Sequence, residues 1–159
     1  MEKEKIQEYS ARVVQANRGE LLVVVYDVIQ DELRSALVSQ VQQNQEAYKN
    51  SLQNAQKFLQ ELIGTLDFQY EVSFQLLSLY KYINKTILEA QRKKDTKELE
   101  GCISIIGKLR SSYAQIALES QEKPMMSNVQ KVYAGLTYGK NSLSEVSVDG
   151  TGGKRGYYA

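Results

Sequence analysis

The chain has 159 residues, of which 42% are hydrophobic and 25% charged, a composition typical of one globular domain. Its 20 Lys and Arg residues nearly balance 19 Asp and Glu residues, so no overall field favours nucleic acid or an anionic membrane. The sequence has no His and a single Cys, Cys102, which excludes Ser–His or Cys–His catalytic pairs and imidazole or thiolate metal clusters. We therefore expect no enzymatic activity and no cofactor or metal.

Residues 1–16 form an N-terminal segment, and Glu and Lys alternate within its first part, 1–10. This segment has no apolar stretch of the kind found in a signal peptide, and nowhere does the chain have the apolar run that membrane insertion requires. We expect a cytoplasmic protein whose N-terminal segment caps the rest of the fold. Ile6 and Tyr9 are three residues apart and would lie on one face of a short helical turn.

Residues 17–122 contain four segments in which apolar residues recur at steps of three and four, the period of an amphipathic helix. The first, 17–41, begins with a capping box formed by Asn17 and Glu20. The second follows Asn44 and ends at Gly64, the third spans 68–94, and the fourth follows a second capping box at 95–98 and runs to 120. Short loops between long helices favour antiparallel neighbours, so the predicted fold is all-α, an antiparallel up-down four-helix bundle.

Pro124 closes the helical region, and residues 123–159 have a different composition. Six of the ten Gly residues lie from Gly135 onward, which predicts a flexible C-terminal tail. The tail nevertheless contains an apolar patch between Met125 and Tyr138. We hypothesise that this patch lies over the bundle and competes with a bound partner.

The predicted helices carry more apolar residues than a bundle interior needs. A wide core stripe could account for any one of them, but surplus apolar positions on neighbouring helices indicate an exposed groove for an apolar partner segment. The candidate groove residues are Phe58, Leu62, Ile63, Leu77, Ile103, Ile105 and Ile106. Gly101 and Gly107 in the fourth helix leave room either for a neighbouring helix or for a partner backbone, whereas Cys102 is expected to be buried.

Four segments in order resemble the flagellin export chaperone family FliS. They are 17–27 (NRGELLVVVYD), 54–62 (NAQKFLQEL) followed by Leu66 and Asp67, 76–83 (LLSLYKYI) and 109–113 (LRSSY). The resemblance covers about residues 5 to 120. The chain departs from the family pattern at Lys81, where the family often has Asp, and at Tyr113, where it often has Trp.

The resemblance implies a cytosolic chaperone that binds the disordered C-terminal region of flagellin, prevents its premature polymerisation and delivers it to the flagellar type III export apparatus. Ile6 and Tyr9 match the apolar and Tyr positions of the family's N-terminal segment. The resemblance implies that this segment covers the groove when it is empty, moves when client binds and contributes to contact with the export gate. From the residues alone, Ile6 and Tyr9 could equally pack on the end of the bundle.

Three other functions are conceivable for an all-helical chain of this composition. A helical scaffold or homodimer could use the same groove, and its mark would be a dimer that flagellin segments do not dissociate. RNA binding would need clustered basic residues, but Arg92, Lys93 and Lys94 are followed by interspersed acidic residues, so we expect a solvated face and no nucleic acid partner. A carboxylate di-metal bundle would need Glu-x-x-His pairs, which a chain without His cannot form.

Overall fold

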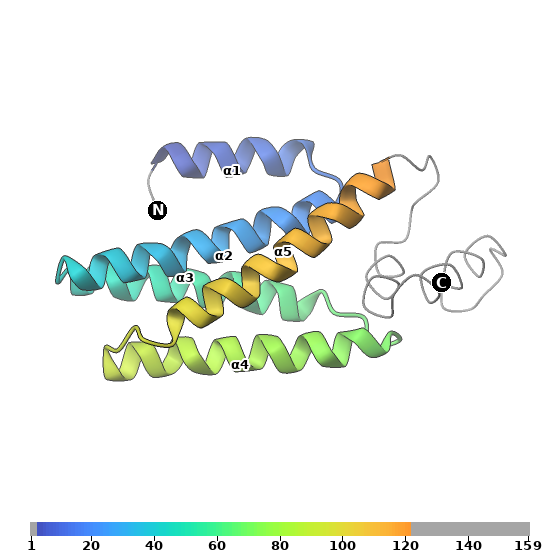
Figure 1. Ribbon diagram of the computed structural model, residues 1–159. Coiled ribbons are helices and arrows are strands. Elements are labelled where there is room, and N and C mark those ends of the chain that lie inside the picture. The colour runs from blue at the N-terminus through green and yellow to red at the C-terminus, as the bar shows by residue number, and fades with distance from the viewer. Residues whose placement is uncertain (1–2, 122–159) are drawn as a thin grey trace, which may run out of the picture.

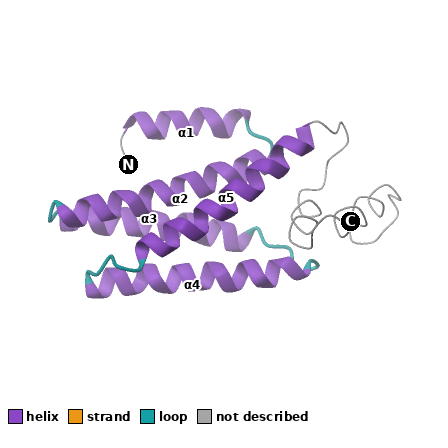
Figure 2. Ribbon diagram, viewed as in Figure 1, coloured by secondary structure: helices purple, strands orange, loops and turns teal. Residues whose placement is uncertain are grey.

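The computed structural model describes residues 3–121, which fold into five α-helices with no strand among them (Figures 1 and 2). The helices are α1 (Lys3–Gln15), α2 (Arg18–Val41), α3 (Gln45–Gly64), α4 (Glu71–Lys93) and α5 (Leu99–Gln121). The prediction of an all-helical fold is confirmed for this part of the chain. The predicted tail, with its apolar patch, lies outside the described residues.

The first two predicted helix starts are confirmed by hydrogen bonds at their N-termini. The Asn17 side chain accepts a 2.9 Å hydrogen bond from the Glu20 backbone, and the Glu20 carboxylate accepts a 3.1 Å bond from the Asn17 backbone, which completes the capping box. The Asn44 side chain accepts from the Ala47 backbone at 3.1 Å and caps α3. The bounds of α2 and α3 therefore agree with the sequence pattern.

The second predicted capping box is wrong. The Asp95 carboxylate accepts a 3.0 Å hydrogen bond from the Lys97 backbone two residues on, and α5 begins only at Leu99. Asp95 therefore closes a local turn instead of capping the helix, a common alternative for this side chain. The turn is needed because Lys94 ends α4 in a left-handed conformation, with φ 56°, from which the chain must change direction.

Helix α2 is central to the arrangement. Successive helices cross Figure 1 in alternating directions, with α3 and α5 against α2 and with α4 below α3. One hydrophobic core joins α2, α3, α4 and α5, and within it the hydroxyls of Tyr26 and Tyr80 share a hydrogen bond. Its largest fully buried apolar side chains include Ile29, Leu33, Leu52, Leu59, Ile83, Ile87, Leu99 and Ile106.

The two glycines of α5 have different surroundings. A Cβ atom at Gly107 would lie 2.8 Å from Nε2 of Gln30, which donates a 2.9 Å hydrogen bond to the Ile103 carbonyl. Gly107 therefore allows α2 and α5 to approach closely, whereas a Cβ at Gly101 would meet nothing within 4 Å. Cys102 is fully buried as expected, and burial raises the pKa of its thiol.

Candidate functional site

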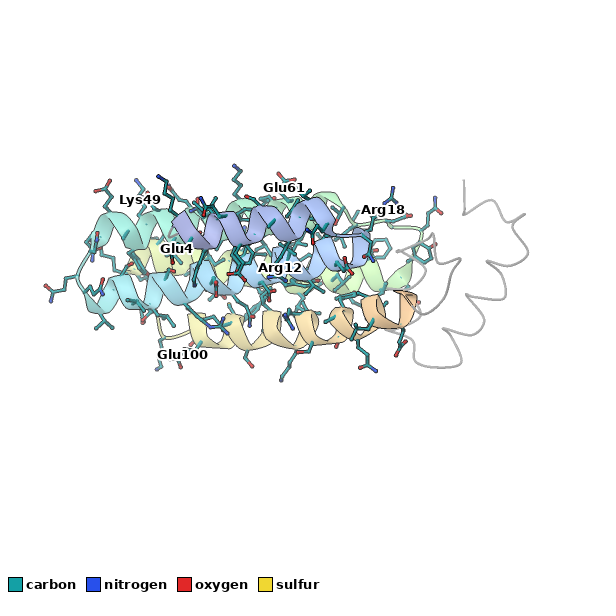
Figure 3. The ribbon with its side chains drawn as sticks, turned by 90° about the horizontal axis from the view of Figure 1, so that it is seen from above. Glu4, Arg12, Arg18, Lys49, Glu61 and Glu100 are labelled. Atoms are coloured by element: carbon teal, nitrogen blue, oxygen red, sulfur yellow. The ribbon has the colours of Figure 1, made fainter. Side chains whose placement is uncertain are left out.

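A largely apolar groove of about 620 Å³ lies between α1, α2 and α3. Viewed from above, α1 lies between α2 and α3, so that it covers this groove along its length (Figure 3). The apolar lining comes from all three helices and consists of Ile6, Val13, Val14, Leu21, Val24, Val25, Val28 and Phe58. Five polar side chains complete the lining: Tyr9, Ser10, Glu32, Asn54 and Lys57. We call this site the α1 groove.

Helix α1 covers the groove without becoming part of the core. It has no buried residue, and its apolar side chains stay exposed, with Ile6 at 49% and Val14 at 85%. Removing apolar area from water is the main source of packing energy, so α1 gains little from this contact. Helix α1 is thus the least firmly packed of the five helices.

Polar contacts fix the position of α1 on α2. The Tyr9 hydroxyl donates to an Asp31 carboxylate oxygen at 2.7 Å, and Lys5 Nζ donates to the same oxygen at 2.9 Å. One helical turn away, Arg12 donates to Asp27 at 2.7 Å. We call these five residues the α1–α2 polar cluster. Hydrogen bonds that involve charged groups contribute more than neutral ones, so the cluster supplies much of the attachment of α1.

The pKa values of the cluster reflect this pairing. Burial raises the pKa of Tyr9, and the hydrogen bond and negative charge of Asp31 raise it further. Burial also acts to raise the pKa of Asp31, but the hydrogen bonds from Lys5 and Tyr9 outweigh it and leave the pKa below its ordinary value. The structure therefore favours a neutral Tyr9 and an ionised Asp31.

Asp27 extends the polar cluster to a third helix. Nε of Arg110, on α5, donates to the Asp27 carboxylate at 2.7 Å, so this one carboxylate binds an arginine from α1 and another from α5. The hydrogen bond to Asp27 raises the pKa of Arg110. If Arg12 left, Asp27 would keep a charged partner, which lowers the cost of releasing α1.

The structure brings together three of the nine residues proposed from sequence. Ile6, Tyr9 and Phe58 all line the α1 groove, although they come from distant parts of the chain. Four others are partly buried on the surfaces of α3, α4 and α5 and do not line it: Ile63, Leu77, Ile103 and Ile105. They form a separate set that we call the outer apolar residues.

Leu62 and Ile106 have to be corrected. Their exposed fractions are 2% and 0%, and both belong to the core, so neither is available on the surface as expected for groove residues. Each lies in register with the core stripe of its helix, Leu62 three residues after Leu59 and Ile106 four after Cys102. Helical periodicity already assigns both residues to the core, so they should not have been counted among the surplus apolar residues of the groove.

The sequence interpretation missed the α2 wall of the groove, formed by Leu21, Val24, Val25 and Val28. The signal was the continuous apolar run 21–25, which is wider than one helical stripe. A helix that is apolar on more than one side must pack on more than one side. Here the extra side faces α1, whose Val13 and Val14 also went unnoticed.

Three further findings concern the described residues beyond the α1 groove. Among residues 3–121, no group of three or more Cys, Asp or Glu side chains is arranged to hold a metal ion. In the same range, no helix combines the length and apolar character needed to cross a membrane. A second exposed aromatic site lies away from the groove, where Phe68 and Phe74 pack with ring centroids 5.1 Å apart.

Comparisons with known proteins agree with the resemblance seen in the sequence. The model of the family described as Flagellar protein FliS matches residues 1–121, which include all five helices. A protein of Bacillus subtilis (strain 168) named Flagellar secretion chaperone FliS is 28% identical over 108 residues. That alignment covers 68% of this chain and 80% of the relative.

Proposed function

The chain belongs to the FliS family of flagellar secretion chaperones, and on this premise we propose that it binds the C-terminal region of flagellin in the α1 groove. Binding would keep flagellin from polymerising prematurely and deliver it to the type III export apparatus in the cytoplasm. In this proposal, α2 to α5 act as an antiparallel four-helix bundle that presents the groove, and no step requires catalysis.

The observation that supports this proposal most is the apolar lining of a groove that α1 covers only loosely. A segment that later packs into a filament needs its apolar side chains shielded while it is unfolded. Burying each one contributes roughly 1.5 to 3 kcal/mol, so several together offset the few kcal/mol that ordering the segment costs. The partly exposed Phe58 and Leu21 are suited to this contact.

Helix α1 would act as a replaceable cover. Its half-exposed Ile6 and Val13 line the groove in the absence of flagellin, and client binding displaces them. The displaced helix then presents Ile6 and Tyr9 to the export gate, the role that the family resemblance implies for them. This proposal requires that α1 be attached by contacts that can be broken and remade, as the α1–α2 polar cluster can.

The outer apolar residues would form a second part of the client surface. A disordered client commonly wraps a large area of its partner. Ile103 and Ile105 lie on α5 close in sequence to Gly101, where the open space leaves room for a client backbone. Leu62 and Ile106 are not part of this proposed surface.

Calorimetric titration of the intact chain with a synthetic C-terminal segment of flagellin from the same organism tests the proposal. We expect binding with a negative heat-capacity change, because apolar area is buried. Phe58→Glu should weaken binding at least about tenfold, the effect of losing a central apolar contact. The matched control is Phe74→Glu, which introduces the same charge at an exposed Phe outside the groove and should bind normally.

Two results would contradict the proposal. A folded wild-type chain that fails to bind the segment would exclude it. If that chain also formed a dimer in light scattering that the segment did not dissociate, a homodimeric scaffold that uses the same groove would explain the apolar lining instead.

A further inference from the structure

Glu32 is a buried acidic residue in the wall of an otherwise apolar groove. It lies on α2, its exposed fraction is 1%, and it lines the α1 groove together with Val28 and Phe58. Asn54 of α3 donates a weak 3.3 Å hydrogen bond to Oε1. The other carboxylate oxygen, Oε2, is buried and has no hydrogen-bond partner among the described residues.

An unpaired buried carboxylate oxygen is costly and therefore unusual in a folded protein. Nearly all buried polar atoms have a partner, and those without one call for an explanation. Burial raises the pKa of Glu32, and the positive charge of the N-terminus, together with the hydrogen bonding of Asn54 and Ser51, opposes this only in part. An apolar residue at position 32 would avoid the cost, so the carboxyl group lowers the stability of the empty groove.

The neighbouring carboxylate of Asp31 does not share this shortage of donors. Asp31, one residue earlier, pairs with Lys5, Tyr9 and Arg34. Arg12, another cation of α1, pairs with Asp27. No described Lys or Arg forms an ion pair with Glu32, even though Lys57 lines the same groove.

We infer that Glu32 is a specificity-determining residue of the α1 groove, which selects a client segment with one Lys or Arg among its apolar residues. The inference deepens the proposed function and rests on it. When such a segment replaces α1, its cationic group donates to Oε2 of Glu32 while its apolar side chains contact Val24, Val28 and Phe58. A charged donor is favoured over a neutral one because hydrogen bonds to ionised groups are stronger, especially where water is excluded.

The pair would also set the register of the client. Apolar contacts are non-directional, so a segment could shift along the groove by one helical turn with little loss. One buried charge pair allows a single alignment, because every other alignment leaves two buried charges unpaired. Glu32 therefore contributes specificity that the apolar lining alone cannot supply.

The test compares Glu32→Gln with the wild-type chain in titrations against the synthetic C-terminal flagellin segment. The variant keeps the size of the side chain and removes its charge. We expect at least about tenfold weaker binding, since a hydrogen bond to a charged group contributes about 1.5 to 3 kcal/mol. Glu61→Gln, an exposed position on α3, is the matched control and should bind as the wild type does (Figure 3). Chemical denaturation should show that Glu32→Gln is at least as stable as the wild type, which a merely structural role would not allow.

A second series changes the flagellin segment and combines each change with the Glu32→Gln variant of the chaperone. Each Lys or Arg of the flagellin segment is replaced by Met in turn, and each peptide is titrated against wild type and Glu32→Gln. One of these replacements should weaken binding to the wild type by the same factor as Glu32→Gln weakens binding of the unchanged segment. The same replacement should cause no further loss of binding to Glu32→Gln. Equal binding of the segment to wild type and Glu32→Gln would overturn the Glu32 inference alone. Failure of the wild type to bind the segment would overturn the proposed function, and the inference with it.

Discussion

The Tyr9 hydroxyl donates a 2.7 Å hydrogen bond to Asp31 and thereby joins a helix with no buried residue to the central helix of the fold. The two residues are 22 positions apart in the chain. The contact is partly buried and sits beside the apolar lining of the groove. The stability of α1 on α2 thus depends on a few polar pairs more than on packing.

Tyr9→Phe is expected to loosen α1 without unfolding the protein. The change removes one partly buried hydrogen bond, which contributes about 0.5 to 1.5 kcal/mol, and leaves the core intact. If α1 competes with flagellin for the groove, affinity for the C-terminal segment should rise about two- to tenfold. Amide hydrogen exchange over 3–15 should become faster. Ser10→Ala is the control, because the hydrogen bond that the Ser10 hydroxyl makes among residues 3–121 stays within α1, to the Ile6 carbonyl.

Acid should release α1. The pKa of Asp31 is lowered by folding, so its contribution to stability is present above the ordinary value of 3.8 and is lost as pH falls through the lower, folded value. As the pH is lowered, amide hydrogen exchange of α1 should therefore become faster before exchange of the α2–α5 core does. Asp31→Asn should remove this acid-dependent step, and its persistence in that variant would contradict the assignment.

Alkali should release α1 as well, for the opposite reason. The pKa of Tyr9 is raised by folding, so its contribution is present below the ordinary value of 10.0 and is lost as pH rises above it. Spectrophotometric titration of the wild type should include a tyrosine that ionises well above its ordinary pKa and is missing from the titration of Tyr9→Phe, with α1 detaching as that tyrosine ionises. If Tyr9→Phe instead lacked a tyrosine that ionises near 10.0, the prediction would be contradicted.

The two glycines of α5 should respond differently to the same substitution. Gly101→Ala faces open space and should stabilise the chain by up to about 1 kcal/mol through helix propensity. Gly107→Ala would push Nε2 of Gln30 from the Ile103 carbonyl and leave a buried amide unpaired, which costs about 1 to 3 kcal/mol. Chemical denaturation should therefore give Gly107→Ala a smaller free energy of unfolding than Gly101→Ala. The reverse order would mean that Gln30 repacks without loss.

The buried tyrosine pair predicts a stability effect in the core. Tyr26→Phe would remove the hydrogen bond between the Tyr26 and Tyr80 hydroxyls and should destabilise the protein by about 1 to 3 kcal/mol. Burial raises the pKa of Tyr80 to about 12, although its hydrogen bond with Tyr26 acts to lower it. Adding Tyr80→Phe should restore part of the loss, because the second change removes the orphaned hydroxyl. Denaturation of the single and double variants measures both steps.

Local sequence signals predicted the helices of the core well. The Asn17–Glu20 box placed the start of α2, and periodic apolar residues such as Ile29 and Leu33 proved to be buried. These features depend on residues within one or two helical turns of each other, which a single sequence displays directly. The capping box at 95–98 was predicted wrongly because an Asp that caps a helix and an Asp that closes a turn cannot be told apart in the sequence.

The α1 groove could be predicted only in part, because it depends on contacts between distant residues. Tyr9 pairs with Asp31 and Arg12 with Asp27, across separations that no local pattern reveals. Helix α1 has no core stripe, so its 13-residue length was not foreseen. Glu32 was not singled out because an acidic residue on a helix is ordinary in a sequence. Only its burial sets it apart, and that burial depends on how α1, α2 and α3 pack.

Hydrogen exchange measured on the full chain with and without the flagellin C-terminal segment tests the central claim, that α1 covers the groove and flagellin replaces it. The account predicts that the segment protects α2 around Val24 and Val28 and α3 around Phe58, while exchange over 3–15 becomes faster. Unchanged exchange over 3–15, with protection confined to other surfaces, would show that flagellin binds elsewhere and would contradict the account.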